Sequence, residues 1–287
     1  MSSTLPPQLT PGHPLLGLGY SAPSRTRPLI RLDGRVGTEA SAAVAEEVPV
    51  ALAYNNHPHV VMMATPADYE DFAVGFTLTE EIVPAPADIT GCTVVPYSQG
   101  VEIQLVIPQD AADALANRGR QLVGRTGCGL CGVQTIADTL RPLRTVGRRA
   151  PIAAEALWRA EASLYGRQTL NQATGSVHAA AWAAPDGELR VVREDVGRHN
   201  ALDKVLGALA RAGTDPADGF IVMTSRASYE LVQKATVAGV PLLAAVSRPT
   251  GLAIRLAEAS GLTLVALLRG RTANIYANPA GVIFTPG

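Results

Sequence analysis

The second half of the chain constrains the fold most, because strand-length apolar runs alternate there with helical patterns from about residue 172 onward. Between the runs, apolar residues such as Leu202, Val205 and Leu209 recur at helical spacing. Strands that alternate with helices of about ten residues are typical of a mainly parallel sheet covered by helices. This half is therefore predicted to be a layered α/β domain. The runs expected to form strands are residues 177–183, 189–192, 220–223, 242–246 and 264–268.

Shifts in composition divide the chain into three parts. Residues 1–28 contain six prolines and no apolar periodicity, which predicts a flexible proline-rich tail. Residues 29–150 carry short alternating runs, and the segment Thr65-Pro-Ala-Asp68 signals a helix start with Thr65 as the N-cap, so a smaller α+β domain is expected there. Residues 151–287 contain the predicted α/β domain.

The overall charge and the apolar runs exclude several classes of protein. The formal net charge is −1 at pH 7 and Lys and Arg form no long run, so binding to nucleic acid is not expected. The longest apolar stretches are only of strand length and no signal-peptide pattern stands at the N-terminus, so neither a membrane span nor export is expected. Three cysteines are a poor disulfide framework, and a location in the reducing cytoplasm is predicted.

The segment Gly124-Arg-Thr-Gly-Cys-Gly-Leu-Cys-Gly132 brings Cys128 and Cys131 together near the end of the first domain, directly before a predicted helix. Glycines leave both sulfurs approachable, and the positive end of a helix lowers the pKa of a thiol, so a reactive thiolate is expected. Two other interpretations stay open. The first is a zinc knuckle, but a closed zinc site needs four ligands and the chain has no second Cys-x-x-Cys. The second is a thioredoxin-type redox pair, but such a pair follows a strand, whereas this one follows an Ala-rich segment and a loop. Cys92 lies in a strand-like run and is expected to be a buried small side chain.

Polar clusters follow two neighbouring strands of the predicted α/β domain. Thr224-Ser-Arg-Ala-Ser228 and Ser247-Arg-Pro-Thr250 each bring hydroxyls and one arginine to the start of a helix, where phosphate groups bind. Ser and Thr at such positions are also ordinary helix caps. The chain has no Walker-type phosphate loop and no dinucleotide fingerprint, and neither His178 nor His199 begins the His-x-Glu of a zinc deaminase. Because two such loops follow neighbouring strands, a nucleotide bound between them is nevertheless predicted.

Four motifs occur along the chain: Gly124 to Gly132, Glu194-Asp-Val-Gly-Arg-His-Asn-Ala-Leu-Asp-Lys204, Ser225-Arg-Ala-Ser-Tyr-Glu-Leu-Val-Gln-Lys234 and Ala244-Ala-Val-Ser-Arg-Pro-Thr250. Together they resemble the formate dehydrogenase accessory sulfurtransferases, the FdhD family. The resemblance implies a C-terminal domain similar to the cytidine deaminase fold. It also implies a sulfur carrier that accepts persulfide sulfur from a cysteine desulfurase. That sulfur passes to the bis(molybdopterin guanine dinucleotide) molybdenum cofactor, bound transiently as substrate, before formate dehydrogenase receives it.

The resemblance assigns roles to individual residues. Cys128 carries the persulfide of this sulfurtransferase, Cys131 is its partner, and the protein holds no metal of its own. Two copies of the chain are expected to be able to pair as a homodimer. The alternatives are a cofactor-binding chaperone with a structural zinc knuckle and a thiol oxidoreductase. The expected cofactor-binding residues are Leu267, Leu268, Arg269, Gly270, Arg271 and Thr272 from the resemblance, Arg226, Ser228, Arg248 and Thr250 in the two polar loops, and Arg198, His199 and Asn200.

Overall fold

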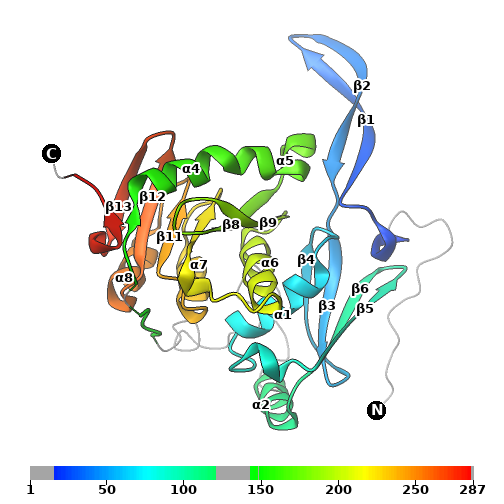
Figure 1. Cartoon of the computed structure of the whole chain (residues 1–287). Coiled ribbons are helices and arrows are strands. Elements are labelled where there is room, and N and C mark those ends of the chain that lie inside the picture. Colours follow the sequence, from blue (N-terminus) through cyan, green and yellow to red (C-terminus); the bar gives the residue numbers. More distant parts are fainter. Residues whose placement is uncertain (1–15, 121–142, 148, 286–287) are drawn as a thin grey trace.

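The computed structural model describes residues 16–120, 143–147 and 149–285 of the chain. Figure 1 shows two layered parts that meet at helices α1 (Tyr69–Thr79) and α6 (Arg198–Arg211). The larger part is built on a six-stranded sheet and the smaller part on a four-stranded sheet, so the predicted α/β class is confirmed. No helix in the described part of the chain is long and apolar enough to cross a membrane.

The six-stranded sheet lies in the second part of the chain and has the order β13-β12-β11-β10-β8-β9. Helices α6, α7 and α8 cover one face, where Leu202, Leu231 and Ala253 pack in one cluster. Helix α4 covers the other face through Leu157 and Ala160. Because both faces are covered, the central strands are apolar throughout. The remaining elements of this part are β7 (Ile152–Ala153), α4 (Ala154–Leu164), η3 (Tyr165–Arg167), α5 (Thr169–Thr174), β8 (His178–Ala183), β9 (Leu189–Asp195), η4 (Pro216–Asp218), β10 (Phe220–Met223), α7 (Tyr229–Val237), β11 (Leu242–Ala245), α8 (Gly251–Ser260), β12 (Thr263–Arg269), β13 (Thr272–Ala277), η5 (Pro279–Gly281) and β14 (Val282–Ile283).

The expectation of a mainly parallel sheet is wrong, because three of the five strand pairings are antiparallel. Strands β10, β11 and β12 run parallel, as strands joined by crossover helices do. Strands β9 and β13 instead follow their neighbours through short turns that contain Gly187 and Gly270, at φ angles of 87° and 59°. A short turn reverses the chain, so each of these outer strands runs antiparallel to its partner.

The four-stranded sheet of the first part has the order β4-β3-β6-β5 and shares a core with α1. Alternate residues of β3, namely Val48, Val50 and Leu52, are buried in one cluster with Phe72 and Phe76 of the helix. This alternation is the period-two pattern of a strand with one face in a core. The elements of this part are η1 (Leu18–Tyr20), β1 (Ser24–Asp33), β2 (Val36–Ala45), β3 (Val48–Tyr54), β4 (His57–Ala64), η2 (Pro86–Asp88), β5 (Gly91–Tyr97), β6 (Gly100–Val106) and α2 (Gln109–Arg120).

The hairpin of β1 and β2 corrects the predicted boundary of the tail, which was expected to end at residue 28. Residues 24–28 belong to β1, whose pairing with β2 runs from Ser24 opposite Ala45 to the turn. Pro28 is compatible with this strand because a two-stranded ribbon leaves one side of each strand without ladder hydrogen bonds. Figure 1 shows the hairpin projecting from the body of the protein. Residues 1–15 lie outside the described residues.

The predicted N-cap role of Thr65 is also wrong, because α1 begins at Tyr69 after Asp68 at φ 53°. The backbone N–H of Thr65 donates to Asp195 Oδ2 (3.0 Å), and its side-chain hydroxyl accepts from the N–H of Val196 (3.0 Å). Its carbonyl accepts from Lys204 Nζ at 3.1 Å. Thr65 therefore connects the two parts of the protein instead of capping a helix.

Helices α1 and α6 approach each other closely at two glycines. A Cβ atom on Gly75 would lie 1.8 Å from the carbonyl oxygen of Asp203, and one on Gly207 would lie 1.9 Å from that of Asp71. Both obstacles are backbone atoms, so a side chain could fit only if the helices separated. Glycine at these positions allows the contact that joins the two parts.

We expect Gly207→Ala to lower the free energy of unfolding by about 3 kcal/mol, since the added methyl group overlaps backbone that cannot rotate away. For a chain of this size the melting temperature would fall by about 6–12 °C in a circular-dichroism melt. Gly166→Ala is the control, because no atom lies within 4 Å of its Cβ position. Equal melting temperatures for the two variants would show that α1 and α6 can move apart at little cost.

Candidate functional site

The two polar loops lie side by side at the edge of the sheet where β10 and β11 end. Each loop leads directly into a helix, the first into α7 and the second into α8. Ala227 and Pro249 form a parallel bridge between the loops, and the N–H of Thr250 donates to the Ala227 carbonyl at 3.0 Å. The two loops were predicted to lie together because they follow neighbouring strands. These strands, β10 and β11, are confirmed as a parallel pair.

The hydroxyl groups of the two loops have different partners. Thr250 Oγ1 accepts from the N–H of Ala253 at 3.3 Å, which is an ordinary helix cap. Ser228 is the N-cap residue of α7 but makes no capping hydrogen bond, and its Oγ is buried without a hydrogen-bond partner among the described residues. Arg226 and Arg248 are exposed. A buried hydroxyl without a partner is costly, so Ser228 is a candidate donor to a ligand.

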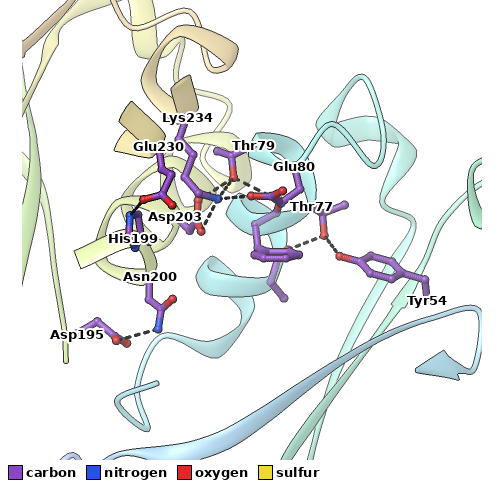
Figure 2. A network of polar contacts seen from close by, with 12 residues as sticks. Tyr54, Thr77, Thr79, Glu80, Asp195, His199, Asn200, Asp203, Glu230 and Lys234 are labelled. Carbon is purple, nitrogen blue, oxygen red and sulfur yellow. Dashed lines mark hydrogen bonds and ion pairs between the residues drawn. The ribbon is translucent and has the colours of Figure 1, made fainter. Parts of the chain in front are cut away.

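The start of α6 lies at the same edge, and its first three residues differ in what they contact. Arg198 Nε is buried with no hydrogen-bond partner in the described part of the chain. His199 Nε2 lies 2.7 Å from Glu230 Oε2 of α7, a close polar contact that does not have the geometry of a hydrogen bond. Asn200 is only 3% exposed, and its Nδ2 donates to the Met63 carbonyl (2.9 Å) and to Asp195 Oδ1 (3.0 Å). Figure 2 shows Asn200 turned toward Asp195, so its amide serves the interior and not a surface ligand.

The stretch predicted to bind cofactor, residues 267–272, ends β12 and turns into β13. Leu267 has a φ of 55°, which is strained for a leucine, and its N–H donates to the Ser247 carbonyl at 3.2 Å. The stretch therefore lies beside the second polar loop. Leu268 is fully buried in the core under α4, so its side chain is not available to a ligand, whereas residues 269–272 are exposed.

Two further residues lie at this edge that the sequence did not single out as ligands. His178 begins β8, and burial together with the charge of Arg198 lowers the pKa of its imidazole. Glu230 lies in the first turn of α7, and the neighbouring His199 lowers the pKa of its carboxyl group. The Ser225 to Lys234 motif contains Glu230, but a sequence motif does not show that its carboxylate faces another helix.

Cys128, Cys131 and the helix expected after them lie outside the described residues, so their roles stay predictions. On the chain's return from that segment, the N–H of Val146 donates to the Ser260 carbonyl at 2.8 Å. Cys92 lies half-buried in β5 against the first core, and burial raises the pKa of its thiol. Within the described ranges, no three His, Cys, Asp or Glu side chains are grouped so that they could hold a metal ion.

Comparison with known proteins identifies the family of this chain. Residues 45–283 match the FdhD/NarQ family. The chain belongs to the FdhD/NarQ family. Among FdhD/NarQ relatives, the sulfur carrier protein FdhD of Bordetella petrii is 46% identical over 275 residues, which is 94% of this chain and 99% of the relative. The sulfur carrier protein FdhD of Xanthomonas campestris pv. campestris strain B100 is 48% identical over 263 residues, or 90% of this chain and 94% of the relative.

A solved structure supports the fold of this FdhD/NarQ member. It is the crystal structure of a protein from Desulfotalea psychrophila described as a formate dehydrogenase accessory protein. The two chains superpose with a TM-score of 0.72 at 24% sequence identity, over 91% of this chain and 99% of the other. At that identity the likeness shows the shared fold.

Proposed function

We propose that this FdhD/NarQ protein is a sulfur carrier that serves formate dehydrogenase in the cytoplasm. Relatives named as sulfur carrier proteins are 46% and 48% identical to it, and the alignments cover at least 90% of this chain. This likeness is the observation that carries the proposal. Cys128 and Cys131 supply the thiols that sulfur transfer requires.

Loading begins with a cysteine desulfurase that carries a persulfide. The Cys128 thiolate attacks the outer sulfur of that persulfide, the S–S bond of the donor breaks, and the desulfurase cysteine leaves as a thiolate. The transferred sulfur is then a persulfide on Cys128. No metal is needed for this exchange, because the thiolate itself is the nucleophile.

Delivery uses the second thiol. The Cys131 thiolate attacks the inner sulfur of the persulfide, which forms a Cys128–Cys131 disulfide and releases the outer sulfur as hydrosulfide to the molybdenum substrate. The two thiols supply the two electrons that reduce this sulfur. A thiol reductant must afterwards open the disulfide before another cycle.

The substrate of this transfer is the bis(molybdopterin guanine dinucleotide) form of the molybdenum cofactor, and the loop edge of the six-stranded sheet is where it binds. The overall charge of the chain is −1, so an anionic ligand must be held by local groups. Exposed Arg226 and Arg248 supply positive charge, and the unpartnered Arg198 Nε and Ser228 Oγ supply donors to phosphate. These groups fit a pyrophosphate, the most highly charged part of a dinucleotide.

Mass spectrometry tests the sulfur-carrier proposal directly. The purified full-length protein is incubated with a cysteine desulfurase and cysteine and then digested without reductant. The mass of the peptide that contains Cys128 is measured. One or more added sulfur atoms on that peptide would support the carrier. Bound zinc and an unmodified peptide would instead support a cofactor chaperone with a zinc knuckle. An unmodified peptide that cycles between dithiol and disulfide would support a thiol oxidoreductase.

We expect Arg226→Ala to weaken GDP binding by about tenfold, since a charge-assisted contact to phosphate contributes roughly 1.5 to 3 kcal/mol. The melting temperature should hardly change, because Arg226 is exposed. Calorimetric titration with GDP and a thermal melt of the same variant measure the two effects. Arg190→Ala is the control, an exposed arginine on β9 whose ion-pair partner is Glu188. Unchanged GDP affinity together with a clearly lower melting temperature would show that Arg226 is a structural residue.

A further inference from the structure

Helices α6 and α7 both begin at the loop edge and are joined by two pairs of polar side chains one helical turn apart. His199 and Asp203 lie four residues apart on α6, and Glu230 and Lys234 are likewise four residues apart on α7, so each pair of side chains shares one helix face. His199 Nε2 lies 2.7 Å from Glu230 Oε2, and Lys234 Nζ lies 3.0 Å from Asp203 Oδ2. Figure 2 shows these four side chains meeting between the helices.

The pair farther from the edge is locked into the junction with α1. Lys234 is 7% exposed, and besides Asp203 it donates to Glu80 Oε1 at 2.8 Å and to Thr79 Oγ1 at 2.9 Å. The Thr79 hydroxyl in turn donates to Asp203 Oδ1 at 2.7 Å. The ammonium group thus has three acceptors for its three protons. This pair fixes the second turn of α7 to the body of the protein.

The pair nearer the edge lies where α7 lacks its usual support. Ser228 makes no capping bond, so the first turn of this helix has no side-chain cap. An uncapped helix start frays easily, because its first N–H groups have no partners. Glu230 is the acidic residue of that turn, where its charge suits the helix dipole, and His199 holds it from α6. The lowered pKa of its carboxyl group agrees with such a contact.

We infer that His199 and Glu230 form a positioning pair that holds the start of α7, and with it the Thr224–Ser228 loop, in the orientation that receives the phosphate of the substrate. The inference rests on the proposed binding of the nucleotide-bearing substrate at this edge. His199 was expected among the residues that touch the cofactor. Here it acts through Glu230 and is not itself a ligand. Arg226 and Ser228, only two to four residues before Glu230, take the orientation that the pair sets.

Hydrogen exchange on the full-length protein tests the pair without any ligand. In both His199→Ala and Glu230→Ala, we expect the amides of residues 225–231 to exchange about tenfold faster than in the wild type. The double variant should exchange no faster than either single variant, because the two side chains act as one unit. Amides of β10 should be unchanged in all of them, which separates local opening from global destabilisation.

Two further variants supply a control and a rescue. Glu258→Ala is the matched control, because Glu258 is an exposed carboxylate on the neighbouring helix α8, and its exchange should equal that of the wild type. His199→Lys places a cation opposite Glu230 and should restore most of the protection that His199→Ala loses. Wild-type exchange in Glu230→Ala, or the absence of rescue by lysine, would overturn the pair.

GDP titration then separates the pair from the proposed binding site. Glu230→Ala should weaken GDP binding at least fivefold, while Glu258→Ala leaves it unchanged. Faster exchange in Glu230→Ala with wild-type GDP affinity would overturn the positioning role. If the wild-type protein itself failed to bind GDP, the proposed nucleotide site would be wrong and the positioning role with it, whereas the exchange data would still judge the contact between His199 and Glu230.

Discussion

Cys128→Ala is expected to abolish sulfur loading by the desulfurase, because alanine offers no thiolate to attack the donor persulfide. In the proposed mechanism Cys131 attacks only the persulfide already formed on Cys128, so the loss should be complete and not a partial reduction in rate. The measurement is the mass of the intact protein, and of its 124–132 region after digestion, following incubation with desulfurase and cysteine.

Cys92→Ala is the matched control for this prediction. Cys92 lies half-buried in β5, and burial raises the pKa of its thiol, so little of it is thiolate at neutral pH. Loading of this variant should equal that of the wild type, with a small loss of stability from the missing sulfur atom. Persulfide formation in Cys128→Ala at the wild-type level would remove Cys128 from the mechanism. Loss of loading in Cys92→Ala would instead show that Cys92, and not Cys128, accepts the sulfur.

Lys204→Met is expected to lower the free energy of unfolding by about 3–5 kcal/mol, because it leaves a buried carboxylate without its cation. The side chains of Lys204 and Asp195 are both 0% exposed, and Lys204 Nζ lies 2.7 Å from Asp195 Oδ2. Asp195 would keep its hydrogen bonds from the N–H groups of Thr65 and Gly197 but lose the charge that balances it. A loss of this size corresponds to a melting temperature lower by about 10 °C.

The control removes an ion pair of similar length on the surface. Arg190 NH2 lies 2.9 Å from Glu188 Oε2, and both side chains are more than half exposed. Arg190→Met should therefore cost less than about 1 kcal/mol. Urea denaturation followed by circular dichroism measures both variants. If they lost similar stability, the buried pair would contribute no more than a surface pair, and the junction around Thr65 would have to rest on packing and uncharged hydrogen bonds.

The sequence alone determined the features that depend on residues close together in the chain. Apolar period and turn chemistry predicted the alternation of strands and helices, and the residues between each strand and helix predicted the two polar loops at one edge of the sheet. Two parallel neighbours, β10 and β11, follow from their crossover connection. The reactive thiolate expected at Cys128 and Cys131 rests on their spacing, their glycine neighbours and the predicted helix after them, and it stays a prediction.

Only the tertiary structure decided the features that join distant segments. The sequence predicts that Thr65 caps a helix, but in the structure its N–H donates to Asp195, 130 residues later in the chain. Asn200 and Leu268 belong to the expected binding stretches, yet long-range packing turns their side chains inward. Glu230 becomes a partner of His199 only because two helices begin at the same edge. Such hydrogen bonds and contacts depend on how the faces of distant helices and strands pack against each other. The local apolar periodicity of a segment does not specify which partner it packs against.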